Sequence, residues 1–298
     1  MLYEFVVEPC LLNEVARSRR NYRQFLELFS LGAPQVISDY PKLKNIRKQV
    51  FRLQPDGAHE SEKQRLEELV RFLSETPRVK RESEYDGSDW LKSVESENVR
   101  VAFDHVLSAL NHGTLPTLRL EQLFDGEITY PNQLLVKRVA SDMAAAVANI
   151  LRLATTIVFV DPYFNTQPTK WQPLIHFLNT ALARRPGPAP TLEVLFSGDK
   201  ANMATPAFLK AKLIAEEPVL VTRCNVTFKS IRELANGEKL HNRYVLTDIG
   251  GVSFGIGLDE GSEHHRDDVA LLNERIYRLR WHQYAEMNGF EVVSQAST

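Results

Sequence analysis

The stretch "KLHNRYVLTDIGGVSFGIGLDEG", Lys239 to Gly261, decides the fold, because an apolar strand is followed at once by a glycine-punctuated one. Side chains alternate between the two faces of a strand, so His241 and Arg243 are expected to point the same way. The next strand leaves one face nearly bare, with only Ser253, Gly255, Gly257 and Asp259 on it. Glycine inside a strand often marks close approach by a ligand. The pattern therefore predicts a shallow cavity beside an imidazole and a guanidinium.

Such a cavity suits chemistry on a phosphodiester. A neutral histidine can attack phosphorus, and a neighbouring cation can stabilise the charge that develops on the non-bridging oxygens. We expect His241 as the nucleophile and Arg243 as the phosphate clamp, since the guanidinium fork matches phosphate oxygens. Asp248 falls on the opposite face by strand parity, so it is expected to act through its neighbours. This chemistry requires no metal ion and no cofactor.

The sequence upstream of this stretch alternates between strand and helix patterns. "TTIVFVDPYF" (155–164) and "TLEVLFSG" (191–198) are buried strands, and "WQPLIHFLNTALARR" (171–185) between them is an amphipathic helix. We predict further helices over 135–151 and 268–288. The order predicts an α/β fold with a mixed, largely parallel sheet flanked by helices. Asp161, at the end of its strand, is expected either to orient a histidine or to cap the following segment.

The first part of the chain has a different pattern. Residues 1–130 are predicted to form a mainly helical region, and residues 131–298 the α/β domain. Apolar residues recur at helical spacing over 11–31, 42–53 and 62–72, after a first strand at 2–8. Residues 1–56 hold nine Lys and Arg against six Asp and Glu. A solvated helix face explains these basic clusters more simply than a binding groove, because few aromatic residues lie among the charges.

The residues "HNRYVLTDIGGVSFG" resemble the His-x-Lys-x4-Asp-x6-Gly signature of the phospholipase D superfamily. His241, Arg243, Asp248 and Gly255 fall at its four positions, with arginine in place of lysine. The "DPYF" corner and the order of strands and helices most closely resemble the C-terminal domains of MIT-domain proteins. That resemblance implies a phospholipase-D-like fold over roughly 132–288 and binding of anionic lipid headgroups without catalysis. The segment "EHHRDD" (263–268) is explained most simply as a solvated loop, but its place after the glycine strand puts it near the mouth of the expected cavity, where His264 or Arg266 could contact a phosphate.

The chain departs from the superfamily pattern after the glycine, where Ile256 and Leu258 replace the expected serine and asparagine. Only one copy of the motif is present, whereas the family's site resembles two motifs facing each other. Two functions therefore stay open. One is a metal-independent phosphodiesterase, most simply a nuclease of a prokaryotic defence system, working as a homodimer. The other is an inactive module that binds nucleic acid, a lipid headgroup or a partner protein.

Composition sets bounds on these functions. A net charge of −2 over 298 residues excludes a chain whose whole surface binds nucleic acid. Cys10 and Cys224, far apart and outside any metal-knuckle spacing, favour a reduced cytoplasmic protein without a disulfide framework. The most apolar stretch, 143–160, is interrupted by Asn149 and Arg152, so no transmembrane segment is expected.

Overall fold

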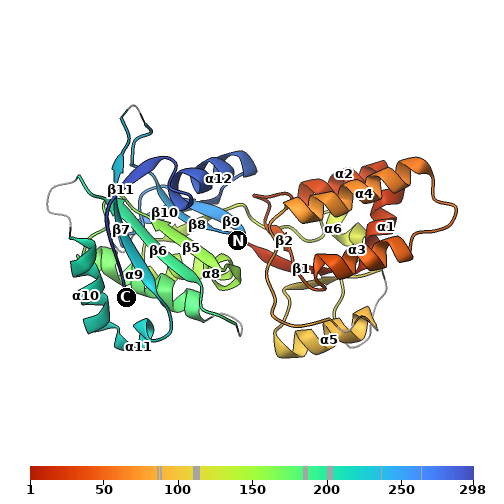
Figure 1. The fold of residues 1–298 in the computed structure, drawn as a ribbon, viewed down its shortest axis with the longest axis horizontal. Coiled ribbons are helices and arrows are strands. Elements are labelled where there is room, and N and C mark those ends of the chain that lie inside the picture. Colours follow the sequence, from red (N-terminus) through yellow and green to blue (C-terminus); the bar gives the residue numbers. More distant parts are fainter. Residues whose placement is uncertain are drawn as a thin grey trace. The chain divides into compact units, whose positions relative to one another are not determined.

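The computed structural model describes residues 1–85, 87, 89–109, 115–183, 187–199, 204–235, 237–262 and 264–298. The chain forms two compact units, here called the N-terminal unit (residues 2–131) and the C-terminal unit (residues 132–298, with Met1) (Figure 1). Of the helices built from the described residues, none combines the length and the apolar character that crossing a bilayer requires.

The N-terminal unit has a small parallel sheet that the sequence did not indicate. Strand β1 (Tyr3–Val7) lies between β2 (Gln35–Ile37) and β3 (His105–Leu107), and all three run in the same direction. Most of the region is helical, as predicted, but the sheet was missed. Strands β2 and β3 are only three residues long, which is too short to show a period. The helices are α1 (Pro9–Arg17), α2 (Arg19–Leu28), α3 (Leu43–Arg52), α4 (Glu60–Glu75), α5 (Trp90–Arg100) and α6 (Leu120–Phe124).

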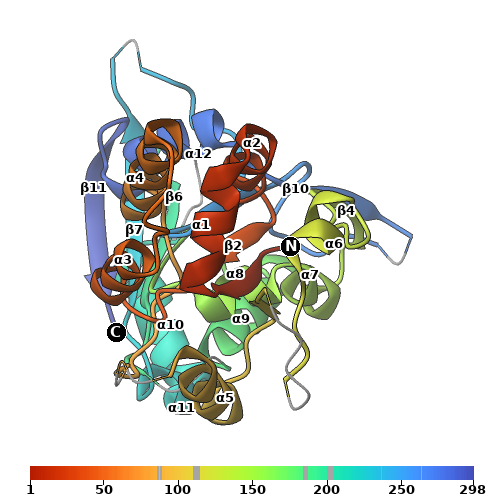
Figure 2. The same cartoon turned by 90° about the vertical axis from the view of Figure 1, so that its right-hand side faces the viewer.

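The segment predicted as one helix over 11–31 is two helices. The chain leaves helical geometry at Ser18, whose side chain accepts a hydrogen bond from the Asn21 backbone N at 3.3 Å and so caps α2. A serine at this position satisfies one of the backbone donors that every helix start exposes. Helix α1 then contacts α2, α3 and α4 (Figure 2).

Strand alternation divides the N-terminal unit into two cores. Phe5 and Val7 point to one face of the sheet and pack into a cluster contributed largely by α1 to α4. Val6 points to the other face and joins Trp90 and Val94 of α5 (Figure 1). Both faces of β1 are therefore covered, which explains why Phe5, Val6 and Val7 follow one another as apolar residues.

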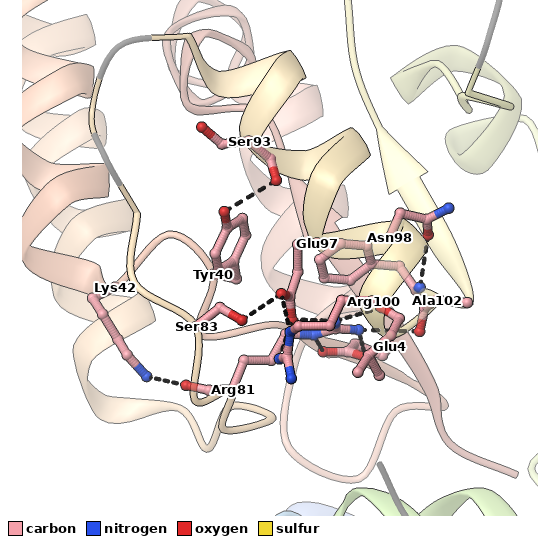
Figure 3. A network of polar contacts seen from close by, with 12 residues as sticks. Glu4, Tyr40, Lys42, Arg81, Ser83, Ser93, Glu97, Asn98, Arg100 and Ala102 are labelled. Carbon is pink, nitrogen blue, oxygen red and sulfur yellow. Dashed lines mark hydrogen bonds and ion pairs between the residues drawn. The ribbon is translucent and has the colours of Figure 1, made fainter. Parts of the chain in front are cut away.

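The α5 side of the sheet also holds a buried polar network (Figure 3). Arg81 is fully buried and donates to both carboxylate oxygens of Glu4, at 2.9 and 2.7 Å, and to Glu97 at 2.8 Å. Its guanidinium also donates to the carbonyls of Val101 and Ala102 and lies 3.5 Å from the ring centroid of Phe103. Arg81 thereby ties the loop before α5 to strand β1 and to the segment that leads into β3.

The C-terminal unit is built on an eight-stranded sheet. The strands are β4 (Gln133–Lys137), β5 (Thr156–Val160), β6 (Thr191–Ser197), β7 (Val226–Glu233), β8 (Arg243–Thr247), β9 (Gly250–Phe254), β10 (Arg266–Leu271) and β11 (Phe290–Ser297). Their order is β11-β7-β6-β5-β8-β9-β10-β4, with β5, β6 and β7 mutually parallel and the other neighbours antiparallel. The predicted mixed sheet flanked by helices is confirmed.

Helices cover both faces of this sheet. Phe177 of α9 (Pro168–Leu182) packs on Phe159 and Phe254, and α10 (Pro206–Glu216) lies on the same face, while α7 (Ala140–Ala146) and α8 (Ala148–Leu153) pack on α9. The other face is covered by α12 (Glu274–Arg280) and the π-helical turn η1 (Trp281–Ala285), where Tyr284 packs on Tyr244. Figure 1 shows α9 and α12 on opposite sides of the sheet. The short helix α11 (Pro218–Val221) follows α10.

Two predicted helices are wrong at their boundaries. Leu135 belongs to edge strand β4, where it is 62% exposed, and not to the following helix. The closing helix predicted over 268–288 begins only at Glu274, because residues 266–271 pair with β9 and β4 as strand β10. Strand β11 was not predicted, because residues 291–295 are exposed and show no apolar alternation.

Candidate functional site

The motif strand begins later than the sequence predicts. Strand β8 starts at Arg243, so His241 lies in the preceding extended segment and its side chain is exposed. Its described electrostatic neighbour is Glu238, which is hydrogen-bonded to Arg280 and Gln283. Burial would raise the pKa of Glu238, but the hydrogen bonds from Arg280 and Gln283, with the charges of Arg280 and His241, together lower it. The strand parity that paired the imidazole with the guanidinium therefore does not extend to residue 241.

Arg243 lies at the edge of the sheet where the parallel strands end. It pairs with Phe254, the last residue of β9, one strand away from Val160 at the end of β5. Its guanidinium carbon is 4.8 Å from the ring centroid of Tyr163, which is 40% exposed. The carboxyl ends of parallel strands are the usual ligand side of an α/β sheet. The arginine of the motif thus occupies the position where a ligand is expected.

A chain of charged contacts surrounds Arg243. Asp161, 3% exposed, accepts a hydrogen bond from the Tyr163 backbone N at 2.9 Å, so it caps the corner after β5. Lys170 of α9 lies 5.8 Å from the Tyr163 ring centroid and 3.9 Å from Asp259. Asp259 in turn accepts a hydrogen bond of 2.5 Å from Arg138. We call Arg138, Asp161, Lys170, Arg243 and Asp259, with the Tyr163 ring, the carboxyl-edge cluster.

The electrostatics of the cluster favour an anion. Burial raises the pKa of Asp161, and Lys170 and Arg243 oppose that rise through their charges. Three cationic side chains face two carboxylates, which leaves one net positive charge when all five are ionised. Within the described part of the chain, the Nε–H groups of Arg138 and Arg243 are buried and donate to no acceptor. Buried polar donors are nearly always satisfied, so these two are exceptions, as is the Nε–H of Arg280 on α12.

The glycines of the motif lie in the loop after β9. A Cβ added at Gly255 would lie 2.9 Å from the Asp267 carboxylate, and one added at Gly257 would clash with the Asp259 carboxylate. Asp267, 2% exposed, accepts hydrogen bonds from the backbone N of Ile256 at 3.0 Å and of Gly257 at 3.4 Å. Both glycines therefore make room for carboxylates of the protein. Their closeness to Asp259 and Asp267 explains their place beside the cluster.

Asp248 lies at the other end of β8 from Arg243. Its carboxylate accepts hydrogen bonds from the Thr155 backbone N at 2.8 Å, the Thr155 hydroxyl at 2.6 Å and the Thr156 backbone N at 3.1 Å. These bonds fix the start of β5 against the turn between β8 and β9. The structure therefore does not bring Asp248 to the cluster, and its contacts give it a structural role.

The remaining predicted residues are dispersed. Ser253, within β9, is half-buried and donates to the Ala270 carbonyl at 3.4 Å. His264 is exposed in the turn that leads into β10. The structure thus brings together Asp161, Arg243 and Asp259, flanked by Gly255 and Gly257, but does not add Asp248 to them.

Sequence reasoning missed Arg138, Tyr163 and Lys170. Tyr163 stands in the "DPYF" corner without a predicted role, although an aromatic residue after a strand end is a recognisable signal. Lys170 begins the helix after that corner, at a position where a cation can turn back to the strand end. Arg138 follows an edge strand whose apolar spacing also fits a helix, so no pattern in the sequence marked it.

The cluster lies over the apolar core, and the cavity that described residues line beneath it is small. Phe159, Phe164, Leu174 and Leu258 line a cavity of about 10 Å³ under Asp161 and Lys170. That volume admits one water at most. Within the described ranges, no three His, Cys, Asp or Glu side chains are grouped to hold a metal ion. A ligand of the cluster therefore binds at the surface.

Comparison with known proteins adds little. No family model and no curated protein matches the chain. Among solved structures, the archaeal chromatin protein TrmBL2, which shows a novel mode of DNA binding, is 13% identical with a TM-score of 0.31, over 58% of this chain and 60% of that one. Phosphatidylserine synthase from Haemophilus influenzae Rd KW20 is 11% identical with a TM-score of 0.33, over 55% of this chain and 46% of the synthase. Similarities this low assign neither a family nor a function.

Proposed function

We propose that the C-terminal unit binds a phosphodiester at the carboxyl-edge cluster, as a phospholipase-D-like domain. The observation that carries this proposal is the gathering of Arg243, Lys170 and the half-exposed Tyr163 ring at the carboxyl end of β5. A phosphate oxygen is a strong acceptor for an arginine, and the single negative charge of a phosphodiester balances the net charge of the cluster.

The shape of the site favours one phosphate of a chain over an engulfed small molecule. The cavity below the cluster is too small for a ligand, whereas the Tyr163 ring is 40% exposed beside Arg243. The phosphodiester would lie against Arg243 and Lys170, with the Tyr163 ring beside it.

Hydrolysis is the second candidate function. The exposure of His241, two residues before the phosphate-binding Arg243, favours it, because an accessible neutral imidazole can attack a phosphorus held by the neighbouring cation. In the proposed mechanism, His241 bonds to phosphorus to form a phosphohistidine while a P–O bond breaks. The departing oxygen takes a proton from a second acid and leaves as an alcohol. One motif per chain supplies one such histidine, so turnover by this route requires a second copy of the protein.

A probe with a single phosphodiester tests binding. We expect the dinucleotide TpT to bind the wild-type protein in excess chelator. Ligand-observed NMR measures the affinity. Arg243→Ala should weaken binding about tenfold or more, since a hydrogen bond to a charged group contributes ~1.5–3 kcal/mol. Arg278→Ala, which removes an exposed arginine paired with Glu274 on α12, is the matched control. Equal affinity of wild type and Arg243→Ala would refute the assignment of this site.

Hydrolysis is measured in the same samples as release of thymidine. We expect His241→Ala to abolish the release while TpT still binds, and His282→Ala, which removes an exposed histidine beside Glu286, to retain it. Sedimentation velocity gives the oligomeric state of each sample. Cleavage by a strict monomer, or cleavage that survives in His241→Ala, would rule out this mechanism.

A further inference from the structure

Helix α3 of the N-terminal unit carries a face made of cations and one aromatic ring. Its inner side holds Ile46, Gln49 and Val50, which are buried. Its outer side holds Lys44, Arg47, Lys48, Phe51 and Arg52, all of which are exposed. Their spacing of three and four residues places them along one stripe of the helix. We call these five residues the α3 stripe.

The α3 stripe is unfavourable for the helix that bears it. Lys44 lies in the first turn, where the helix dipole disfavours positive charge, and that turn has no acidic residue and no side-chain cap. Lys44 and Lys48, and Lys48 and Arg52, are like charges four residues apart, an arrangement that destabilises helices. Helix α4 follows the opposite pattern, with acidic residues in its first turn. Local rules of this kind are typically broken at functional sites.

The charges of the α3 stripe are not neutralised within the described chain. None of its four cations lies within 4 Å of a carboxylate there, although α4 next to it is rich in glutamate. Phe51 lies between them in sequence and is 37% exposed. Helix α2, on the other side of α1, also begins with two exposed arginines, Arg19 and Arg20. The basic character is thus shared by two helices of this unit.

We propose that the α3 stripe is a docking surface for single-stranded nucleic acid. The cations neutralise successive backbone phosphates, and the Phe51 ring stacks on an unpaired base, the combination by which strands are held without a deep groove. The phosphates of the strand would neutralise the cations that repel one another along α3. This surface lies on a different unit from the carboxyl-edge cluster and does not depend on its proposed function.

The test is fluorescence anisotropy with a labelled 20-nucleotide single strand over 50–200 mM salt. Replacing Lys44, Lys48 and Arg52 by glutamine should weaken binding and reduce the slope of log affinity against log salt by about 0.7 for each phosphate that the variant no longer neutralises. Phe51→Ala should weaken binding about fivefold or more with the slope unchanged, and Phe51→Trp should restore it. Lys63→Gln with Arg71→Gln, exposed cations of α4, is the matched control.

Each variant is made with and without Arg243→Ala, so that the two sites are separated. The docking proposal predicts that the loss on altering the α3 stripe persists in the Arg243→Ala background. Affinity lost only with Arg243→Ala would overturn it and leave the carboxyl-edge cluster intact. Binding of the wild type to phosphatidylserine vesicles but not to the strand, lost in the same glutamine variants, would also overturn it in favour of a membrane. Circular dichroism should show that the glutamine variants fold.

Discussion

The buried arginine of the N-terminal unit gives a sharp test of what holds that unit together. Arg81 donates five hydrogen bonds, two to Glu4, one to Glu97 and two to backbone carbonyls (Figure 3). Arg81→Met keeps most of the volume but leaves Glu4, 1% exposed, without its guanidinium. Breaking a buried ion pair by removing one partner costs ~3–5 kcal/mol. We expect the N-terminal unit to lose that much stability.

The measurement follows this unit alone within the full chain. Hydrogen exchange of β1 and α5 peptides, read by mass spectrometry across a urea series, gives the free energy of unfolding of the N-terminal unit. Lys63→Met, an exposed change on α4, is the control and should stay within about 0.5 kcal/mol of wild type.

A second variant identifies the cause. If the cost comes from the carboxylate that has lost its guanidinium, then Glu4→Gln in the Arg81→Met background should recover at least ~1 kcal/mol, because a neutral amide is cheaper to bury than a charge. A loss below ~1 kcal/mol for Arg81→Met, or a double variant that is less stable than the single, would refute this reasoning.

Three further predictions concern stability. Hydrogen bonds from Arg100, Ser83 and Arg81 together outweigh burial and lower the pKa of Glu97 to about 2. The ionised Glu97 should therefore stabilise the fold fully above about pH 5, and this stabilisation should be lost as the pH falls towards 2. Hydrogen exchange of α5 peptides across an acid titration will detect the loss. Gly251→Ala should cost ~1–3 kcal/mol in thermal denaturation, because the added Cβ would lie 2.9 Å from buried Leu246. Asp248→Ala should cost a similar amount, because it removes the acceptor of three hydrogen bonds from residues 155–156, and Asp248→Asn should be intermediate. An unchanged melting temperature would contradict the prediction for Gly251 or for Asp248.

The central elements of the C-terminal unit could be predicted because their apolar patterns are strong. Strand β5 is a continuous and largely β-branched run, β6 is an apolar run interrupted only by Glu193, and α9 between them is amphipathic, so the type of each element could be predicted. The edges could not be predicted. Strand β4 has apolar residues at spacings that also fit a helix, and β11 is exposed on both faces, so neither carries a distinct period.

The site was predictable only in part for a related reason. Asp161 follows the end of β5, which the sequence marks clearly, whereas Arg243 and Asp259 were predicted from the residue pattern of 239–261 and not from the ends of β8 and β9. Lys170 and Arg138 reach the cluster through tertiary packing of a helix and an edge strand, which one sequence does not encode locally. The start of β8 depends on where its pairing with β5 ends, at Tyr244, and that limit left His241 outside the strand.

The position of Asp248 bears on how relatives of this protein should be sought. Arg243 is the first residue of β8 and Asp248 directly follows its last residue, so the spacing of the motif measures the length of one strand. Its acidic end anchors a neighbouring strand and never reaches the ligand side. A search by this spacing will therefore retrieve chains that share an architecture, whether or not they retain chemistry. Under the proposed function, the residues to compare lie at the opposite end of β8, where Arg138 and Lys170 contact Asp259.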